Sequence, residues 1–409
     1  MKRFITIISL LALAAAAGPA RLSACTSVIV SGRVTSDGKP LMLKNRDQKD
    51  FDNILVGMKG EKYSFVGVRD HTMKVPKSVV GGTNEAGLSI MSTSIKNTEK
   101  ADDRKWGASG KLIAMGLGSC STVEEFEELL NKLEKPDYKS SFGVIDARGG
   151  AAYFQCNKGK WYKLDVNDPS VAPDGWKVVS NYSDIGSFDK FSRLGGFARR
   201  EEGEYVMRTL TLSSLTPWSL LDAFCRTWYN VRMGVNFSRD YDTLVKKGWF
   251  NGTAYDSDFI ARHSTVSTMV FQGAEKPVMW TVLGNPACGV MIPVPVLDAE
   301  YLPSYMLPAA SDGKSALCSL CVGVKDRLMY LPDVSNGTAY VRLDNLLRGT
   351  QGRPAVLDCV RAAESRIRDL FLPLCAGRAS MNAEEFALAY ARQSEEYFRI
   401  FKEEFAPLL

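Results

Sequence analysis

The chain has 409 residues, of which 45% are hydrophobic and 24% are charged. This composition is typical of a globular protein and excludes a fibrous or intrinsically disordered chain. The formal net charge is only +5 and no long run of Lys or Arg occurs, so nucleic-acid binding has no electrostatic footprint here.

The first 24 residues differ from the rest of the chain. Lys2 and Arg3 precede an apolar, Ala-rich stretch at 4–18, and small residues lead to Ala24. This layout is typical of a secretory signal. It predicts a secreted or periplasmic protein from which 1–24 is removed as a signal peptide or propeptide. No later stretch reaches the ~18 apolar residues that a membrane span needs, so we expect no transmembrane span in the mature chain.

The first elements predicted after the signal form a hairpin. Residues 26–32 are β-branched and end in glycine, 36–39 contain an Asp-Gly turn, and 40–43 form the returning strand. The same criteria predict further strands at 142–146, 152–156, 161–165, 267–272 and 278–283.

Three helices are predicted from apolar residues at helical spacing. The first follows Thr122, which forms a capping-box pattern with Glu125, and the others cover 355–372 and 382–405. Strand pairs interleaved with helices favour a layered protein of mixed helix and sheet. A loop-like stretch at about 296–320 divides the expected main domain, 25–300, from a C-terminal helical extension, 301–409, which we expect to pack on the same domain.

Several kinds of site have no support in the sequence. There are only two histidines, neither with a second His at i+3 or i+4, and there is no Gly-x-Ser-x-Gly or phosphate-loop motif. We therefore predict no metal and no cofactor. The pair Cys318 and Cys321 could be redox-active or metal-binding, but without a second pair it favours packing or a local disulfide.

Cys25 stands directly after the predicted cleavage point. If the Ala24–Cys25 bond is cut, the thiol lies beside its own α-amine, whose reference pKa of about 7.7–8.0 is close to the thiol value of about 8.5. The amine can then accept the thiol proton, so the nucleophile needs no His. Signal peptidase could make this cut, or an earlier cut could be followed by autoproteolysis. Residues 22–25 also match a lipoprotein signal, in which Cys25 would carry lipid on its thiol.

The segment that follows favours the interpretation of Cys25 as a nucleophile. Residues 25–47 contain Cys-Thr, a strand, an Asp-Gly turn, a second strand and Lys-Asn-Arg-Asp. This pattern resembles the mature start of cysteine N-terminal-nucleophile hydrolases, closest to the linear-amide C–N hydrolases related to penicillin acyltransferase and more distantly to choloylglycine hydrolases. Segments 82–88, 141–154 and 179–181 also resemble this family. The resemblance covers about 25–290 and fades beyond.

The resemblance implies a fold and a set of roles. The fold is an α+β, four-layer αββα sandwich with two antiparallel sheets, to which this chain adds C-terminal helices. Cys25 is implied as nucleophile and base, and Asp47 as the group that holds its thiol or amine. Lys44, where many relatives have Arg, would pair with Asp47 or face the substrate. Asn181 is the implied oxyanion donor, with Asn84 as a second donor.

The implied reaction is attack on an amide, release of the amine and hydrolysis of a thioester. The expected partner is a small-molecule amide substrate, with a homo-oligomer possible. Two alternatives stay open: a lipoprotein that is anchored at Cys25 and binds a ligand, and an acyltransferase that passes the acyl group to an amine.

Overall fold

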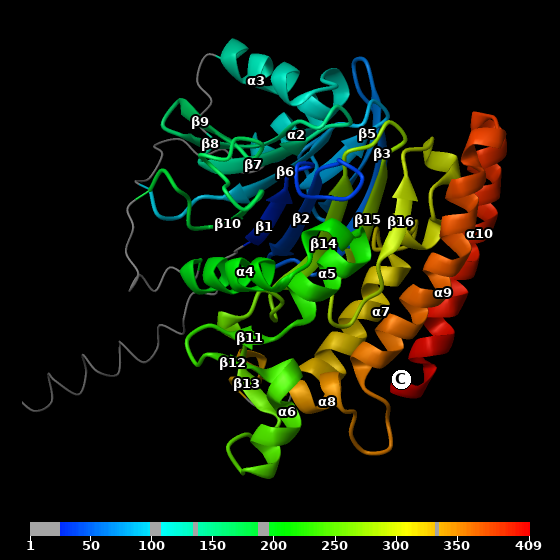
Figure 1. Ribbon diagram of the computed structural model, residues 1–409. Helices are drawn as coiled ribbons and strands as arrows, with labels where there is room; N and C mark the ends of the chain where they lie inside the picture. The colour runs from blue at the N-terminus through cyan, green and yellow to red at the C-terminus, as the bar shows by residue number, and fades with distance from the viewer. Residues whose placement is uncertain (1–24, 99–107, 134–137, 187–195, 332–334) are drawn as a thin grey trace, which may run out of the picture.

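The computed structural model describes residues 25–98, 108–133, 138–186, 196–331 and 335–409 (Figure 1). The predicted signal segment, 1–24, lies outside these residues. Among the described residues, no helix has both the length and the apolar character required to cross a membrane.

Two antiparallel sheets form the centre of the molecule. The first, sheet A, has the order β10-β1-β2-β14-β15-β16. Its strands are β1 (Cys25–Val30), β2 (Leu41–Asp47), β10 (Trp176–Ser180), β14 (Thr265–Gln272), β15 (Val278–Leu283) and β16 (Ile292–Pro295). The second, sheet B, runs from β3 to β9 in chain order. Its strands are β3 (Asn53–Lys59), β4 (Ser64–Asp70), β5 (Gly81–Asn84), β6 (Ser89–Ser94), β7 (Ser140–Ile145), β8 (Ala151–Asn157) and β9 (Lys160–Asp165). The strands predicted from the sequence are confirmed.

Helices cover the outer face of each sheet (Figure 1). On sheet B, α2 (Ala108–Ser119) and α3 (Val123–Lys132) share an apolar core with its strands. On sheet A, α4 (Phe197–Thr209) contacts β1 and β10, and α5 (Pro217–Arg226) contacts β2 and β14. The expected α+β sandwich of four layers, αββα, is thereby confirmed.

The β1 strand occupies a central position. It lies between β10 and β2 in sheet A, its inner face packs on β6 and β8, and its outer face packs on α4. All six of its residues are buried. Burial on both faces explains why its sequence, Cys-Thr-Ser-Val-Ile-Val, does not alternate between apolar and charged residues.

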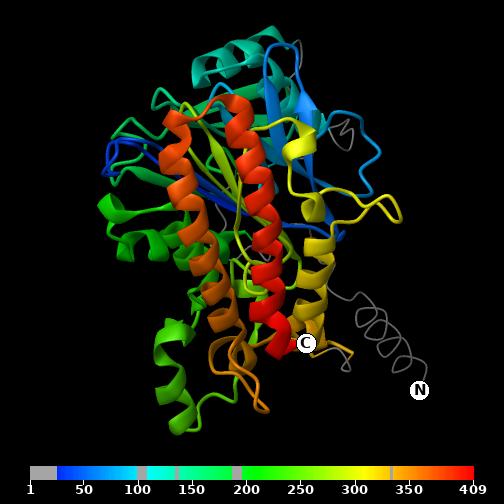
Figure 2. The ribbon, with the colours of Figure 1, turned by 90° about the vertical axis from the view of Figure 1, so that its right-hand side faces the viewer.

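The C-terminal helices continue the core of sheet A. Figure 2 shows α9 (Val356–Gly377) and α10 (Ala383–Phe405) as a long antiparallel pair, and their buried side chains belong to the same apolar cluster as those of sheet A. The Tyr390 hydroxyl of α10 donates to the Pro293 carbonyl of β16 at 2.7 Å. Smaller elements on this side are β11 (Tyr229–Asn230), β12 (Val235–Asn236), α6 (Phe237–Lys246), β13 (Thr253–Tyr255), α7 (Ala316–Val324), β17 (Tyr340–Arg342) and α8 (Leu343–Leu347).

The expected boundary near residue 300 is crossed by direct contacts. β17 pairs with β13, so a strand of the C-terminal part completes a two-stranded sheet with a strand of the main body. The loop-like stretch at 296–320 contributes Leu302, Tyr305 and Met306 to the main core before α7 begins. This stretch is therefore packed on the body and is not an extended linker.

The N-terminal caps of α10 and α3 differ. At α10, the Asn382 side chain accepts from the Glu385 backbone, and the Glu385 carboxylate accepts from the Asn382 backbone, so the full box forms. At α3, Thr122 accepts from the Glu125 N–H at 3.2 Å, but the Glu125 carboxylate accepts from Ser121 at 2.6 Å instead. Only half of that predicted box is present.

All nine cysteines are free, and all except Cys375 are buried. The Cys318 thiol donates to the Phe51 carbonyl and accepts from the Asn53 N–H, each at 3.3 Å. Burial raises the pKa of this thiol to about 12. Cys318 and Cys321 therefore act in packing. Packing was one of the two roles that the sequence favoured for this pair, the other being a local disulfide.

Candidate active site

Cys25 is the first residue of β1, and its side chain is 8% exposed. Because side chains alternate along a strand, Cys25 and Ser27 point to the same face. The Ser27 hydroxyl accepts a hydrogen bond from Tyr153 of β8 at 3.1 Å. The Cys25 side chain therefore faces the space between the two sheets.

Asn181 directly follows β10 and holds the backbone nitrogen of Cys25. Its Oδ1 accepts from the Cys25 N–H at 2.8 Å, and its Nδ2 donates to the Ser94 carbonyl at 2.6 Å. The orientation of the amide is fixed because a donor faces one end and an acceptor faces the other. The Asn181 carbonyl in turn accepts from the Lys96 N–H at 2.9 Å. Asn181 thus joins the end of β10 to the end of β6 beside Cys25.

Asp47 ends β2 and is 1% exposed. Its carboxylate accepts from Arg262 Nε at 2.8 Å, from Arg199 at 3.4 Å and from the Thr265 hydroxyl at 2.7 Å. Two guanidinium groups therefore surround one carboxylate in a buried position. Such a carboxylate is stable only because these donors replace its water.

Arg199 and Arg262 were not predicted from the sequence. They lie 152 and 215 residues from Asp47 along the chain. Arg199 is on α4 and has a fully buried side chain, and Arg262 is 12% exposed in the turn before β14. A buried Asp47 requires cationic partners, and this requirement is the one signal that could have indicated the two arginines. It does not say which arginines of the chain they are.

Lys44 faces the same side of sheet A as Cys25. It pairs with Ser27 in the register of β1 and β2, and Asp47, three residues later, points to the other face. The Lys44 ammonium donates to the Val80 carbonyl at 2.8 Å, whereas Asp47 forms ion pairs with Arg199 and Arg262. Lys44 therefore lies on the inner face of sheet A with Cys25, and Asp47 lies on the outer face.

Burial lowers the pKa of Lys44 to about 8, although the nearby Cys25 raises it. An unfolded Lys has a pKa of about 10.4, so between pH 8 and 10.4 the unfolded chain binds a proton that the folded chain does not. The folded state therefore gains stability from Lys44 as pH rises. We expect Lys44→Met to stabilise the protein more at pH 7 than at pH 10, with the advantage over wild type shrinking by about 2 kcal/mol.

Urea denaturation at the two pH values measures this difference. Lys39→Met removes an exposed ammonium from the turn before β2 and serves as the control. An advantage of Lys44→Met that is equal at pH 7 and pH 10 would contradict the prediction.

Asn84 lies away from the other site residues. It ends β5, and its Nδ2 donates to the carbonyls of Leu117 and Cys120 at 2.8 and 2.7 Å, while its Oδ1 accepts from the Leu88 N–H. It adjoins the Ser89 end of β6, whereas Asn181 contacts the Ser94 end, about 16 Å further along that strand. In this structure Asn84 fastens a turn of sheet B to the end of α2.

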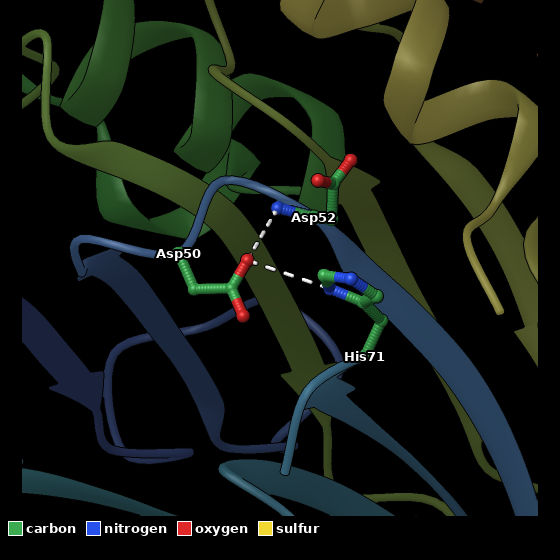
Figure 3. A group of neighbouring side chains, drawn as sticks. All are labelled: Asp50, Asp52 and His71. Carbon is green, nitrogen blue, oxygen red and sulfur yellow. Dashed lines mark hydrogen bonds and ion pairs between the residues drawn. The ribbon is translucent and has the colours of Figure 1, made fainter. Parts of the chain in front are cut away.

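Asp50, Asp52 and His71 form a second group of polar side chains (Figure 3). Asp50 Oδ1 lies 3.5 Å from His71 Nδ1 and accepts from the Asp52 N–H at 3.1 Å. Asp52 forms an ion pair with Lys314 at 2.8 Å. All three residues are partly exposed. With Asp52 already paired to Lys314, the group is a network of partly exposed polar side chains.

No protein-family model matches the sequence, and no curated protein matches it. Solved structures with a similar arrangement include a Caenorhabditis elegans ortholog of N-acylethanolamine-hydrolyzing acid amidase, with a TM-score of 0.39 and 14% identity over 60% of this chain and 92% of that one. A variant of conjugated bile acid hydrolase from Clostridium perfringens has a TM-score of 0.37 and 12% identity, over 63% and 89%. Penicillin V acylase from Agrobacterium tumefaciens has a TM-score of 0.35 and 14% identity, over 63% and 83%. Similarity this low assigns no role to any residue, so the roles rest on the geometry above.

Proposed function

We propose that the protein is a secreted amidase that hydrolyses a linear amide C–N bond through a thioester on Cys25. The observation that carries this proposal is the position of Cys25 at the start of a central strand, with its nitrogen held by Asn181 Oδ1 at 2.8 Å. In the uncut chain this nitrogen belongs to the Ala24–Cys25 peptide bond. Cleavage of that bond turns it into an α-amine beside the thiol.

The α-amine would serve as the base. It accepts the thiol proton, and the thiolate attacks the carbonyl carbon of the substrate amide. The tetrahedral intermediate collapses, its C–N bond breaks, and the protonated α-amine returns its proton to the leaving amine. Water then attacks the thioester with the same amine as base, which releases the carboxylic acid and restores the thiol.

The oxyanion of the intermediate needs hydrogen-bond donors. An asparagine amide has two N–H bonds, and one of those on Asn181 is used by the Ser94 carbonyl. We assign the second Asn181 N–H to the oxyanion. A donor of this kind is worth roughly 100- to 1000-fold in rate.

The burial of Cys25 argues against the lipoprotein alternative. Its side chain is 8% exposed and its strand has neighbours on both sides. A diacylglyceryl group on Sγ could not be accommodated between the sheets without withdrawing β1 from the core, which is close-packed. The acyltransferase alternative uses the same thioester, and it applies if an added amine takes the acyl group faster than water does.

The intact mass of the protein purified from a secreting host tests the proposal. We expect a chain that begins at Cys25 and carries no modification. A diacylglyceryl mass on Cys25, or a stable product that retains residues before Cys25, would contradict a free N-terminal nucleophile.

A further inference from the structure

We propose that Arg199 is a positioning residue that keeps the α-amine of Cys25 in its neutral, basic form. The inference rests on the proposed function, since it concerns the same amine. Arg199 lies on α4, outside the sequence segments that indicated Cys25, and the inference adds it to the residues of the candidate site.

Arg199 contacts three groups around the nucleophile. Its guanidinium donates to the Thr26 hydroxyl at 3.2 Å, to Asp47 at 3.4 Å and to Asn181 Oδ1 at 3.3 Å. The last of these oxygens is the one that accepts from the nitrogen of Cys25. Arg199 and the Cys25 nitrogen therefore share a single acceptor, and the guanidinium fixes the orientation of that acceptor.

Titratable groups on several elements interact with Cys25 or with the residues that contact it. They are Lys44 and Asp47 of β2, Lys96 after β6, Arg199 and Glu202 of α4, and Arg262 before β14. Lys44, Lys96 and Arg199 are each close enough to Cys25 to interact with it electrostatically. Burial raises the pKa of Glu202 well above its ordinary value, although a hydrogen bond with the Ile260 backbone and the charge of Arg199 lower it. Asp47 is the carboxylate in this set that forms ion pairs with both Arg199 and Arg262.

This balance has a direct consequence for the amine. A single carboxylate, that of Asp47, faces two guanidinium groups, those of Arg199 and Arg262. The pKa of Arg199 is lowered by burial and by Arg262 only to about 10, so it stays charged at pH 7. A positive excess beside an amine disfavours its protonated form and lowers its pKa. The same excess favours the thiolate, which helps the proton to leave the thiol–amine pair.

Arg199 is better placed for this effect than Arg262. Arg262 lies 2.8 Å from the Asp47 carboxylate, so the carboxylate offsets the charge of Arg262. Arg199 lies further from this carboxylate, at 3.4 Å, so less of its charge is offset. Arg199 also has a side chain that is fully buried, so water and salt screen its charge little.

The test is the pH dependence of alkylation of Cys25 by iodoacetamide in protein that begins at Cys25, followed by mass spectrometry of the N-terminal peptide. The midpoint reports the first proton that leaves the thiol–amine pair. We expect Arg199→Gln to raise this midpoint by about one pH unit and to move the acid limb of kcat/KM upward by a similar amount. Arg199→Lys keeps the charge and is expected to stay within a few tenths of a unit.

Arg208→Gln is the matched control, because Arg208 lies on the same helix but is 61% exposed and pairs with Glu204. Coinciding midpoints for wild type and Arg199→Gln would overturn the inference, as would an equal shift in Arg208→Gln. If circular dichroism shows that Arg199→Gln is unfolded, Arg199→Lys decides: a rise of a full unit despite the retained charge would contradict the proposal.

Alkylation separates this inference from the proposed function. If no amide is hydrolysed, or if hydrolysis survives Cys25→Ala, the proposed function fails while the midpoints still measure the effect of Arg199. If hydrolysis depends on Cys25 but the midpoints coincide, the function stands and the role of Arg199 does not.

Discussion

Cys25→Ala is expected to reduce amide hydrolysis by at least about 10⁴-fold. Alanine removes the sulfur that would form the thioester, while the strand, Asn181 and the buried charges remain. The measurement is the release of amine from a panel of N-acyl substrates by purified protein. Loss of a nucleophile is expected to lower kcat and kcat/KM together, because the bond it makes is formed in the transition state.

Cys375→Ala provides the control for this experiment. Cys375 is a partly exposed thiol on α9, and its replacement should leave the rate within about twofold, as expected for a surface change away from the site. Substantial hydrolysis by a folded Cys25→Ala protein would remove Cys25 from the mechanism and the proposed reaction with it.

Glu364→Gln is expected to lower the free energy of unfolding by about 3 kcal/mol. Glu364 of α9 forms a bidentate pair with Arg226 of α5, at 2.8 and 2.9 Å, and accepts from the Met291 N–H at 2.8 Å. The Arg226 side chain is fully buried. Burial lowers its pKa, but the Glu364 carboxylate raises the pKa above its ordinary value. Removal of the carboxylate leaves a buried cation whose remaining acidic neighbour is Asp222, at 3.3 Å.

Urea unfolding at pH 7 measures the loss. Asp242→Asn is the matched control because it makes the same chemical change in an ion pair whose acid is 75% exposed, and such pairs contribute about 0–1 kcal/mol. Equal losses of unfolding free energy in the two variants would show that the buried ion pair contributes no more to stability than the exposed one. A change in the slope of the unfolding free energy against urea concentration would instead indicate an altered unfolded or native ensemble.

The sequence predicted the elements whose side chains follow a pattern. Strands β1 and β2 have β-branched or apolar runs on either side of an Asp-Gly turn, and α10 has aromatic residues at helical spacing after a capping box. These signals are local, so the elements can be predicted without knowledge of the tertiary contacts.

Helix α4 was missed for the opposite reason. Its buried residues include Arg199 and Glu202, and a pattern search expects such residues to face water. They are buried because partners far along the chain surround them. The same long-range contacts hid Arg199 and Arg262 from the prediction of the site.

The candidate site residues near the start of the chain follow a local pattern. Cys25 and Asp47 lie at the ends of the two strands of one hairpin, so their spacing is read directly from the sequence. Asn84 shows the limit of such patterns, because an Asn-Glu-x-Gly turn looks alike whether its amide faces a substrate or, as here, the carbonyls of Leu117 and Cys120.

The pairing of β13 with β17 has a consequence for the order of events at the ribosome. Thr253 of β13 faces Arg342 of β17, and Tyr390 near the end of the chain bonds to Pro293. A nascent chain that stops before these partners have emerged lacks a strand and an apolar cover for sheet A. Contacts between such distant segments form slowly, because a long loop must close first. The body that carries Cys25 therefore completes its folding only after β17 and Tyr390 have joined it.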